Sequence, residues 1–309
     1  MIKLETAVLL ITYKRLDTTK LVFDSIRQAK PPKLYIASNT GKDDRGIQEV
    51  NKVREFLENN IDWDCKLYKL YRDKHLSAKH SISGAIDWFF ENEEMGIVLE
   101  DDCLPSQSFF LFCEQLLIKY KNDMRVWHIG GTSTLSNDIL LNDDSYYFSY
   151  FNHIWGWAGW SNKWKYYDIN VALFNEFKNN NFIENITKNN LLQSFWLNNF
   201  NSVHKKRIDT WDYQWYFTIW SNGGMAIIPT INLVSNLGFG PEATHTSNSD
   251  DKLSAMTKNE INLNLVHPKI LMPNIIYDKY NSKFLFDINY INFCKNWIKL
   301  KIKKIINIW

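Results

Sequence analysis

Three consecutive acidic residues, Glu100, Asp101 and Asp102, directly follow the apolar run Gly96–Leu99. This run predicts a buried strand, so the three carboxylates would repel one another beside a low-dielectric core. A divalent cation that bridges diphosphate oxygens would neutralise them, and Mg²⁺ or Mn²⁺ accepts such hard oxygen ligands. The alternative is an acidic cap for the helix predicted near Pro105, worth about 1 kcal/mol. Because a cap needs one acid and three are present, we favour the metal site.

The residues before this triplet alternate between strand-like and helix-like segments. Strands are predicted at 7–13, 34–38, 65–70 and 96–99, and helices at 18–29, 48–60 and 80–91. This is the order of a parallel α/β sheet, in which ligands collect at the carboxyl ends of the strands. The pattern therefore predicts an α/β fold with a Rossmann-like, doubly wound mixed sheet and places the acidic triplet at its ligand-binding edge.

The rest of the chain is richer in aromatic residues. We predict a helix at 105–120, a Gly- and Trp-rich section at 127–164, surface helical turns at 174–201, an aromatic helix at 211–220, a strand at 225–229 and an aperiodic loop at 234–251. We divide the chain into a first half (1–104), a second half of the same domain (105–250) and a C-terminal extension with a basic amphipathic helix (251–309).

Several landmarks in this order resemble a known family. They are Gly96–Asp102 with Pro105 and Phe109-Phe110, then Trp127–Gly131, then Trp155–Trp160 with Trp164, and finally Trp211-Asp212. This set resembles the N-acetylglucosaminyltransferase I family and the bacterial family-2-like glycosyltransferases. The resemblance extends over residues 5–247.

The resemblance implies a single large domain of GT-A fold and an inverting, metal-dependent transfer of sugar from a nucleotide-diphosphate sugar. It implies that 1–104 is the nucleotide-sugar-binding half and 105–250 the acceptor-binding half. It implies that Asp102 is the direct ligand of Mn²⁺ or Mg²⁺ and that Glu100 and Asp101 meet sugar and ribose hydroxyls. Asp212 would be the base that deprotonates the acceptor.

The nucleotide would also contact residues after the first strands. Arg15 matches a family arginine near the nucleotide, and Thr12 opens the same loop. Asn39 stands where the family has an aspartate that reads the base, and an amide both donates and accepts, so a uracil preference is less strictly implied. Lys79 and His80, near a helix start, are expected either to face phosphate or to be solvated charges.

An inverting transfer needs one carboxylate near the acceptor hydroxyl and apart from the metal-bound acids. Asp209 and Asp212 flank Trp211 just before an aromatic helix, so either is a candidate base. The alternative role for Asp209 is to cap that helix.

The acceptor would meet aromatic residues. Strand alternation places Trp155 and Trp157 on one face, where they would floor a sugar site or, alternatively, form core behind it. Trp211 and Glu242 are further acceptor candidates. His245, in a Gly-containing loop, would complete the metal shell or, alternatively, be a surface histidine.

Composition indicates which partners and which cellular compartment to expect for this protein. A net charge of +2 predicts no nucleic-acid partner, and four cysteines without a C-x-x-C pair indicate a reducing, cytoplasmic compartment. No run reaches membrane-spanning length. The tail 291–309 has five lysines, no acid and interspersed aromatic residues. It is expected either to lie on the anionic inner leaflet, making the protein peripheral to the plasma membrane, or to pack on the domain.

Our first hypothesis is therefore a glycosyltransferase of bacterial surface polysaccharide assembly, with a uridine-linked donor and a saccharide or lipid-linked saccharide acceptor. A second is a nucleotidyltransferase that makes sugar nucleotides, but such enzymes need a Gly-rich loop after the first strand and residues 12–17 contain no glycine. A third is a non-catalytic carbohydrate-binding protein that uses the Trp-rich section, which sugar-nucleotide turnover would exclude.

Overall fold

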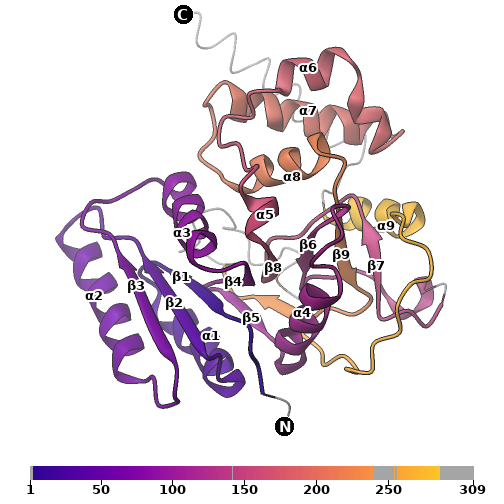
Figure 1. Ribbon diagram of the computed structural model, residues 1–309. Coiled ribbons are helices and arrows are strands. Elements are labelled where there is room, and N and C mark those ends of the chain that lie inside the picture. Colours follow the sequence, from indigo (N-terminus) through magenta and orange to yellow (C-terminus); the bar gives the residue numbers. More distant parts are fainter. Residues whose placement is uncertain (1–2, 141, 240–253, 255, 286–309) are drawn as a thin grey trace, which may run out of the picture.

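The computed structural model describes residues 3–140, 142–239, 254 and 256–285. Within them, eight strands form one sheet in the order β3-β2-β1-β4-β8-β6-β9-β7 (Figure 1). These strands are β1 (Val8–Thr12), β2 (Lys33–Ser38), β3 (Lys66–Tyr71), β4 (Met95–Glu100), β6 (Val126–Gly130), β7 (Tyr146–Ser149), β8 (Trp157–Trp160) and β9 (Met225–Pro229). β7 and β8 run antiparallel to their neighbours and the other pairs are parallel. The predicted mixed, doubly wound α/β sheet is confirmed.

Helices cover both faces of the sheet, because alternate residues of a strand point to opposite sides. Leu10 belongs to one buried cluster and Leu9 to the other. The first cluster is covered by α1 (Leu16–Ala29), α2 (Asp44–Asn59) and α4 (Gln107–Lys119). The second is covered by α3 (Ala78–Asn92), α5 (Ser161–Trp164), α6 (Phe174–Asn179), α7 (Asn190–His204) and α8 (Asp212–Ser221).

Shorter elements complete the domain. They are the 3₁₀ turns η1 (Asn137–Ile139) and η2 (Phe182–Asn185), the strands β5 (Cys103–Pro105) and β10 (Val234–Asn236), and α9 (Ile275–Leu285). β10 pairs antiparallel with β5, with Asn236 opposite Cys103. The prediction of an aperiodic loop from residue 234 is thus wrong for 234–236, and the pairing brings this segment beside the acidic triplet.

The extension after residue 255 is tied to the sheet domain by two acids. Glu260 accepts hydrogen bonds from the backbone N–H groups of Gln107 (3.0 Å) and Ser108 (2.7 Å) at the start of α4. Asp278 on α9 accepts from the Tyr150 N–H at 3.0 Å (α9 lies beside β7 in Figure 1). The tail 291–309 lies outside the described residues, so its two alternatives stay predictions. No described helix is long and apolar enough to cross a bilayer.

The Asn-rich segment is not only surface. α7 buries Leu192, Trp196, Phe200 and Val203 at helical spacing, and its asparagines occupy the other positions. The prediction of surface turns missed this apolar stripe, which spans three to four turns and packs on α8.

A neutral histidine lies at the centre of the second cluster. His128 Nδ1 accepts from the Trp215 indole N–H at 3.2 Å, and its Nε2 lies 2.9 Å from the His153 carbonyl. Because a carbonyl only accepts, Nε2 carries the proton and the ring is neutral. Burial lowers the pKa of His128 to about 3 and that of His153 to about 4.

We expect these rings to destabilise the fold in acid. The ordinary histidine pKa is about 6.5. As the pH falls from this value towards 3, His128 becomes protonated in the unfolded chain but stays neutral in the folded protein. The free energy of unfolding therefore falls. At pH 5 the His128 contribution is about 2 kcal/mol. His128→Gln keeps one acceptor and one donor but does not titrate. Urea unfolding at pH 7 and pH 5 should show a loss about 2 kcal/mol smaller in this variant. Equal losses would mean that His128 is not held neutral.

Candidate functional site

The acidic triplet lies at the carboxyl end of β4, at the centre of the sheet. Glu100 ends the strand opposite Ile11 of β1, so β1 and β4 end side by side. Asp101 Oδ2 accepts a hydrogen bond of 2.8 Å from the N–H of Tyr13, the first residue after β1. The triplet therefore occupies the edge at which parallel α/β sheets collect ligands.

Little positive charge from the described residues balances the three carboxylates. Burial raises the pKa of Glu100 well above that of an ordinary glutamate, and the charges of Asp102 and Asp101 raise it further. Burial and then Asp102 raise the pKa of Asp101 to about 7, against the lowering effect of the Tyr13 N–H. Burial also raises the pKa of Asp102. The side chains are partly exposed, but enough protein surrounds them for burial to be the largest effect. The site favours a bound cation.

One cation of the chain, Arg15, faces the triplet. Its Nη1 lies 3.8 Å from Asp102 Oδ2, and its Nη2 donates to the Leu237 carbonyl at 3.2 Å. The Leu237 N–H in turn donates to the Asp102 carbonyl at 2.7 Å. A Cβ at Gly238 would lie 2.2 Å from Asp102 Oδ2, so a larger residue there would require the Asp102 carboxylate to move. The residues directly after β10, Leu237 and Gly238, therefore pack against Asp102, the carboxylate expected to hold the metal.

Asp212 approaches the triplet from the other half of the chain. It is the first residue of α8, and its charge is among the causes that raise the pKa of Glu100. The Thr210 hydroxyl donates to Asp212 Oδ1, which orients the carboxylate. The helix N-terminus favours its negative charge. The structure therefore brings together the two acidic groups that the sequence analysis singled out.

Asp209 has a different role from the one expected. It does not cap its own helix, α8, but accepts at the N-terminus of α3. Its carboxylate accepts hydrogen bonds from the Ser77 hydroxyl (2.8 Å), the Ala78 N–H (3.1 Å) and the Lys79 N–H (3.3 Å). Burial raises its pKa, but the bonds from Ser77 and the two N–H groups outweigh it, so the pKa lies below the ordinary value. Asp209 therefore ties the loop before Asp212 to the start of α3.

Removing this tie should destabilise the fold modestly. We expect Asp209→Ala to lower the free energy of unfolding by about 1 kcal/mol, because an N-cap acceptor is lost. Asp64→Ala is the matched control, an exposed loop aspartate without a recorded hydrogen bond among the described residues. Urea unfolding at pH 7 measures both. An Asp209→Ala variant as stable as the control would show that the cap contributes nothing.

The three tryptophans expected to meet acceptor divide between the two faces of the sheet. Trp155 is partly buried against the first cluster and contacts the Phe239 ring edge-on at 5.8 Å. Trp157 is 1% exposed and stacks between His128 (5.1 Å) and Trp211 (6.2 Å), which is 4% exposed. The expectation of a shared face for Trp155 and Trp157 is wrong. Gly156 between them has φ +62°, which breaks the strand alternation.

The burial of these rings separates core from surface. Trp157 and Trp211 are core residues, because a ring this buried cannot offer its face to a sugar. Trp155 alone of the three keeps an accessible part.

The nucleotide-side candidates lie along the same edge. Thr12 ends β1, is buried, and its hydroxyl lies 3.5 Å from the Ala37 carbonyl. Asn39 follows β2. Its Nδ2 donates to the Leu76 carbonyl, and its Oδ1 accepts from the Leu76 N–H. The Lys79 N–H bonds to Asp209. His75, in the loop after β3, was not among the predicted candidates, because a single histidine in a polar loop has no local signal of its position.

Two candidates, Glu242 and His245, lie in the segment 240–253 outside the described residues, so their roles stay predictions. Within the part of the chain that the structure describes, no three His, Cys, Asp or Glu side chains are grouped so as to hold a metal ion by themselves.

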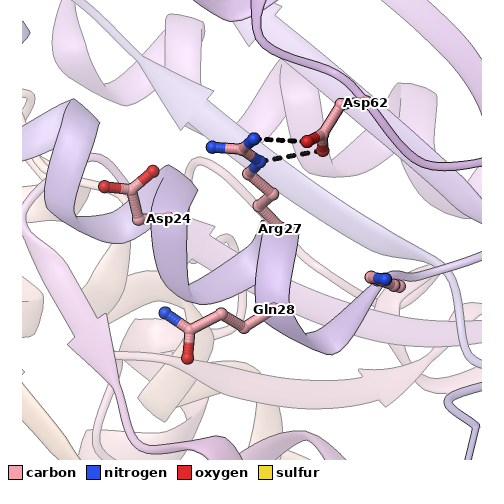
Figure 2. Close-up of a pocket in the computed structure, with 5 residues that line it drawn as sticks. Asp24, Arg27, Gln28 and Asp62 are labelled. Carbon is pink, nitrogen blue, oxygen red and sulfur yellow. Dashed lines mark hydrogen bonds and ion pairs between the residues drawn. The ribbon is translucent and has the colours of Figure 1, made fainter.

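Two surface hollows lie away from the carboxylates. One, of about 320 Å³, lies at the C-terminal end of α8 around Tyr150, Phe177 and Trp220. The other, of about 380 Å³, surrounds the bidentate Arg27–Asp62 pair (Figure 2). Because α1 runs antiparallel to the strands, its end at Lys30 lies at the opposite edge of the sheet from Glu100. Charge and hydrogen bonding, and not hollow size, identify the candidate site.

The sequence matches no protein-family model and no curated protein sequence. Among solved structures, residues 1–349 of S. aureus TarS align with a TM-score of 0.41 and 9% identity, over 82% of this chain and 70% of that chain. The 4-diphosphocytidyl-2C-methyl-D-erythritol synthase of Anaerococcus prevotii aligns with a TM-score of 0.37 and 10% identity, over 72% and 88%. HddC of Yersinia pseudotuberculosis aligns with a TM-score of 0.31 and 10% identity, over 51% and 78%. These scores carry no functional argument, and the fold assignment rests on the strand order.

Proposed function

We propose that this protein is a metal-dependent, inverting glycosyltransferase that uses a nucleotide-diphosphate sugar, with uridine diphosphate as the expected carrier. The observation that carries the proposal is the approach of Asp212 to Glu100 from the opposite half of the chain. A second carboxylate on its own helix, outside the triplet, is what deprotonation of an acceptor requires.

The carboxylates of this site suit the proposed metal ion. The described residues offer no protein-only cage, whereas Mg²⁺ and Mn²⁺ are commonly held by one or two carboxylates plus substrate phosphates. Asp102 would be the direct protein ligand, and His245 remains a second candidate. When bound, the ion would act as a Lewis acid that neutralises charge on the departing diphosphate.

The protein's own side chains would carry out the proton transfer and bind the two substrates. Asp212 takes the proton of the acceptor hydroxyl, whose oxygen forms the bond to the anomeric carbon from the face opposite the diphosphate. The bond between the anomeric carbon and the diphosphate oxygen breaks, and its electron pair leaves with the nucleoside diphosphate. Arg15, beside Asp102, is placed to attract that diphosphate. Glu100 and Asp101 would bind hydroxyls of the donor.

The test is to incubate purified protein with nucleotide sugars and Mn²⁺ and to identify the released product. Release of nucleoside diphosphate with an inverted product supports the proposal. Release of pyrophosphate from a nucleoside triphosphate and a sugar phosphate would indicate a nucleotidyltransferase. Sugar binding without any release would indicate a carbohydrate-binding protein. Thermal shifts of the same nucleotide sugars with and without Mn²⁺ identify the donor to use.

The cellular role is a further part of the proposal. A saccharide or lipid-linked saccharide acceptor in bacterial surface polysaccharide assembly, reached at the inner face of the plasma membrane through 291–309, is consistent with the basic, aromatic tail. Its test is whether deleting 291–309 reduces sedimentation with anionic vesicles while turnover of a soluble acceptor persists.

A further inference from the structure

We propose that His75 reads the base of the nucleotide, accepting the N3–H of a uracil ring at its Nε2 while the Tyr13 ring flanks the base. This inference rests on the proposed function and adds the residue that selects the base. The base would lie at the rim of the site beyond Asp101, where the loops after β1, β2 and β3 meet through Tyr13, Thr40 and His75.

Asn39 cannot take this role in the observed arrangement. Its Oδ1 accepts from the Thr40 N–H at 3.0 Å and from the Leu76 N–H at 3.1 Å, and its Nδ2 donates to the Leu76 carbonyl at 2.8 Å. An amide oxygen has two lone pairs, and both are engaged. With 8% of its surface exposed, Asn39 fixes the loop after β3 and has no acceptor left for a base.

His75 has the free acceptor that Asn39 lacks. Its Nδ1 lies 2.7 Å from the Thr40 carbonyl, and a carbonyl only accepts, so Nδ1 carries the proton. In the neutral ring, Nε2 is then an acceptor. Among the described residues Nε2 has no recorded hydrogen-bond partner, and the side chain is partly exposed.

The position of His75 fits the nucleoside end of the donor. Its ring lies 5.8 Å from the Tyr13 ring, and the Tyr13 N–H binds Asp101. The diphosphate end is expected at Asp102 and Arg15, so the base would extend from there along the sheet edge towards β3. An aromatic face with one polar acceptor beside it is the usual composition of a site for a flat, polar ring.

The loop that carries His75 is held on both sides, which fixes its acceptor before a ligand arrives. Arg54 donates to the Arg72 carbonyl at 3.1 Å at the start of the loop. Asp209 accepts from the Ser77 hydroxyl at its end. Such preorganisation reduces the entropy lost on binding.

The experiment compares uridine diphosphate with its N3-methyl analogue, which lacks the donor, by calorimetry with Mn²⁺ at pH 8. We expect the wild-type protein to bind the analogue about tenfold more weakly, the effect of one lost hydrogen bond. His75→Phe keeps a flat ring but no acceptor, so it should bind uridine diphosphate about as weakly as the analogue and no longer distinguish the two. His267→Phe is the matched control. His267 is exposed and bonds to Tyr146 of β7, at the opposite edge of the sheet from β3, so this variant should bind both ligands as wild type does.

Three results would overturn the inference. Wild-type protein could bind both ligands equally, His75→Phe could retain the discrimination, or cytidine diphosphate could bind more tightly than uridine diphosphate. Each leaves the glycosyltransferase proposal standing, because nucleotide still binds. If no nucleoside diphosphate binds, the proposed function fails together with the base reading. If His75→Phe misfolds, His75→Ala replaces it, because alanine also lacks an acceptor and should likewise bind uridine diphosphate and its N3-methyl analogue equally.

Discussion

Asp102→Asn is expected to abolish turnover and to remove the Mn²⁺-dependent part of donor binding. The amide loses the negative charge that would hold the ion, and metal ions supply several kcal/mol of charge stabilisation to a transition state. That corresponds to a loss on the order of 10³-fold or more in rate. The measurements are steady-state turnover and donor affinity with and without Mn²⁺.

Stability separates this loss from misfolding. Asp102 raises the pKa of both Glu100 and Asp101, so the metal-free protein should keep its melting temperature, or gain, when this like charge is removed. Asp17→Asn, in the first turn of α1 and exposed, is the control for a generic aspartate change. An Asp102→Asn protein with full Mn²⁺-dependent activity would show that the ion is held elsewhere.

Asp212→Asn is expected to cut turnover by about 10²–10⁴-fold, the usual contribution of a general base, while donor affinity in Mn²⁺ changes little. The amide is nearly isosteric and its oxygen still accepts from the Thr210 hydroxyl, so the start of α8 should persist. The loss should appear in kcat, because the proton is transferred after both substrates are bound.

Asp209→Asn is the comparison for this second variant. Asp209 lies nearby but binds the N-terminus of α3, and an amide oxygen can still accept there, so its turnover should fall far less. A dead Asp209→Asn with an active Asp212→Asn would move the base by one turn. Full activity in both would leave Glu242 as the next candidate.

Local patterns in the sequence were sufficient for the first half of the fold. The strands and helices between residues 7 and 100 were predicted within a few residues, because their apolar periodicity is regular and their boundaries carry Pro, Gly and Asp. The placement of Glu100–Asp102 after a buried strand followed from the same patterns. Strand 225–229 was predicted with the bounds that β9 has.

The second half contains elements that local patterns do not mark. β7 and β8 are four residues long, and β10 has three, so each depends on its partner strand for its hydrogen bonds. The order of β8, β6, β9 and β7 in the sheet is likewise a matter of long-range pairing. Aromatic content predicted a core or a sugar site around Trp157, and only burial decided for the core.

The sequence by itself therefore determined the α/β class, the acidic triplet and the residue types available for chemistry, since these depend on composition and on neighbours along the chain. The tertiary structure decided which of those residues meet. It brought Asp212 to Glu100, moved the Asp209 cap from α8 to α3, and engaged Asn39 while leaving His75 an acceptor. The physical reason is that charge interaction and hydrogen bonding act over a few ångströms in space, and separation along the chain does not reveal that distance.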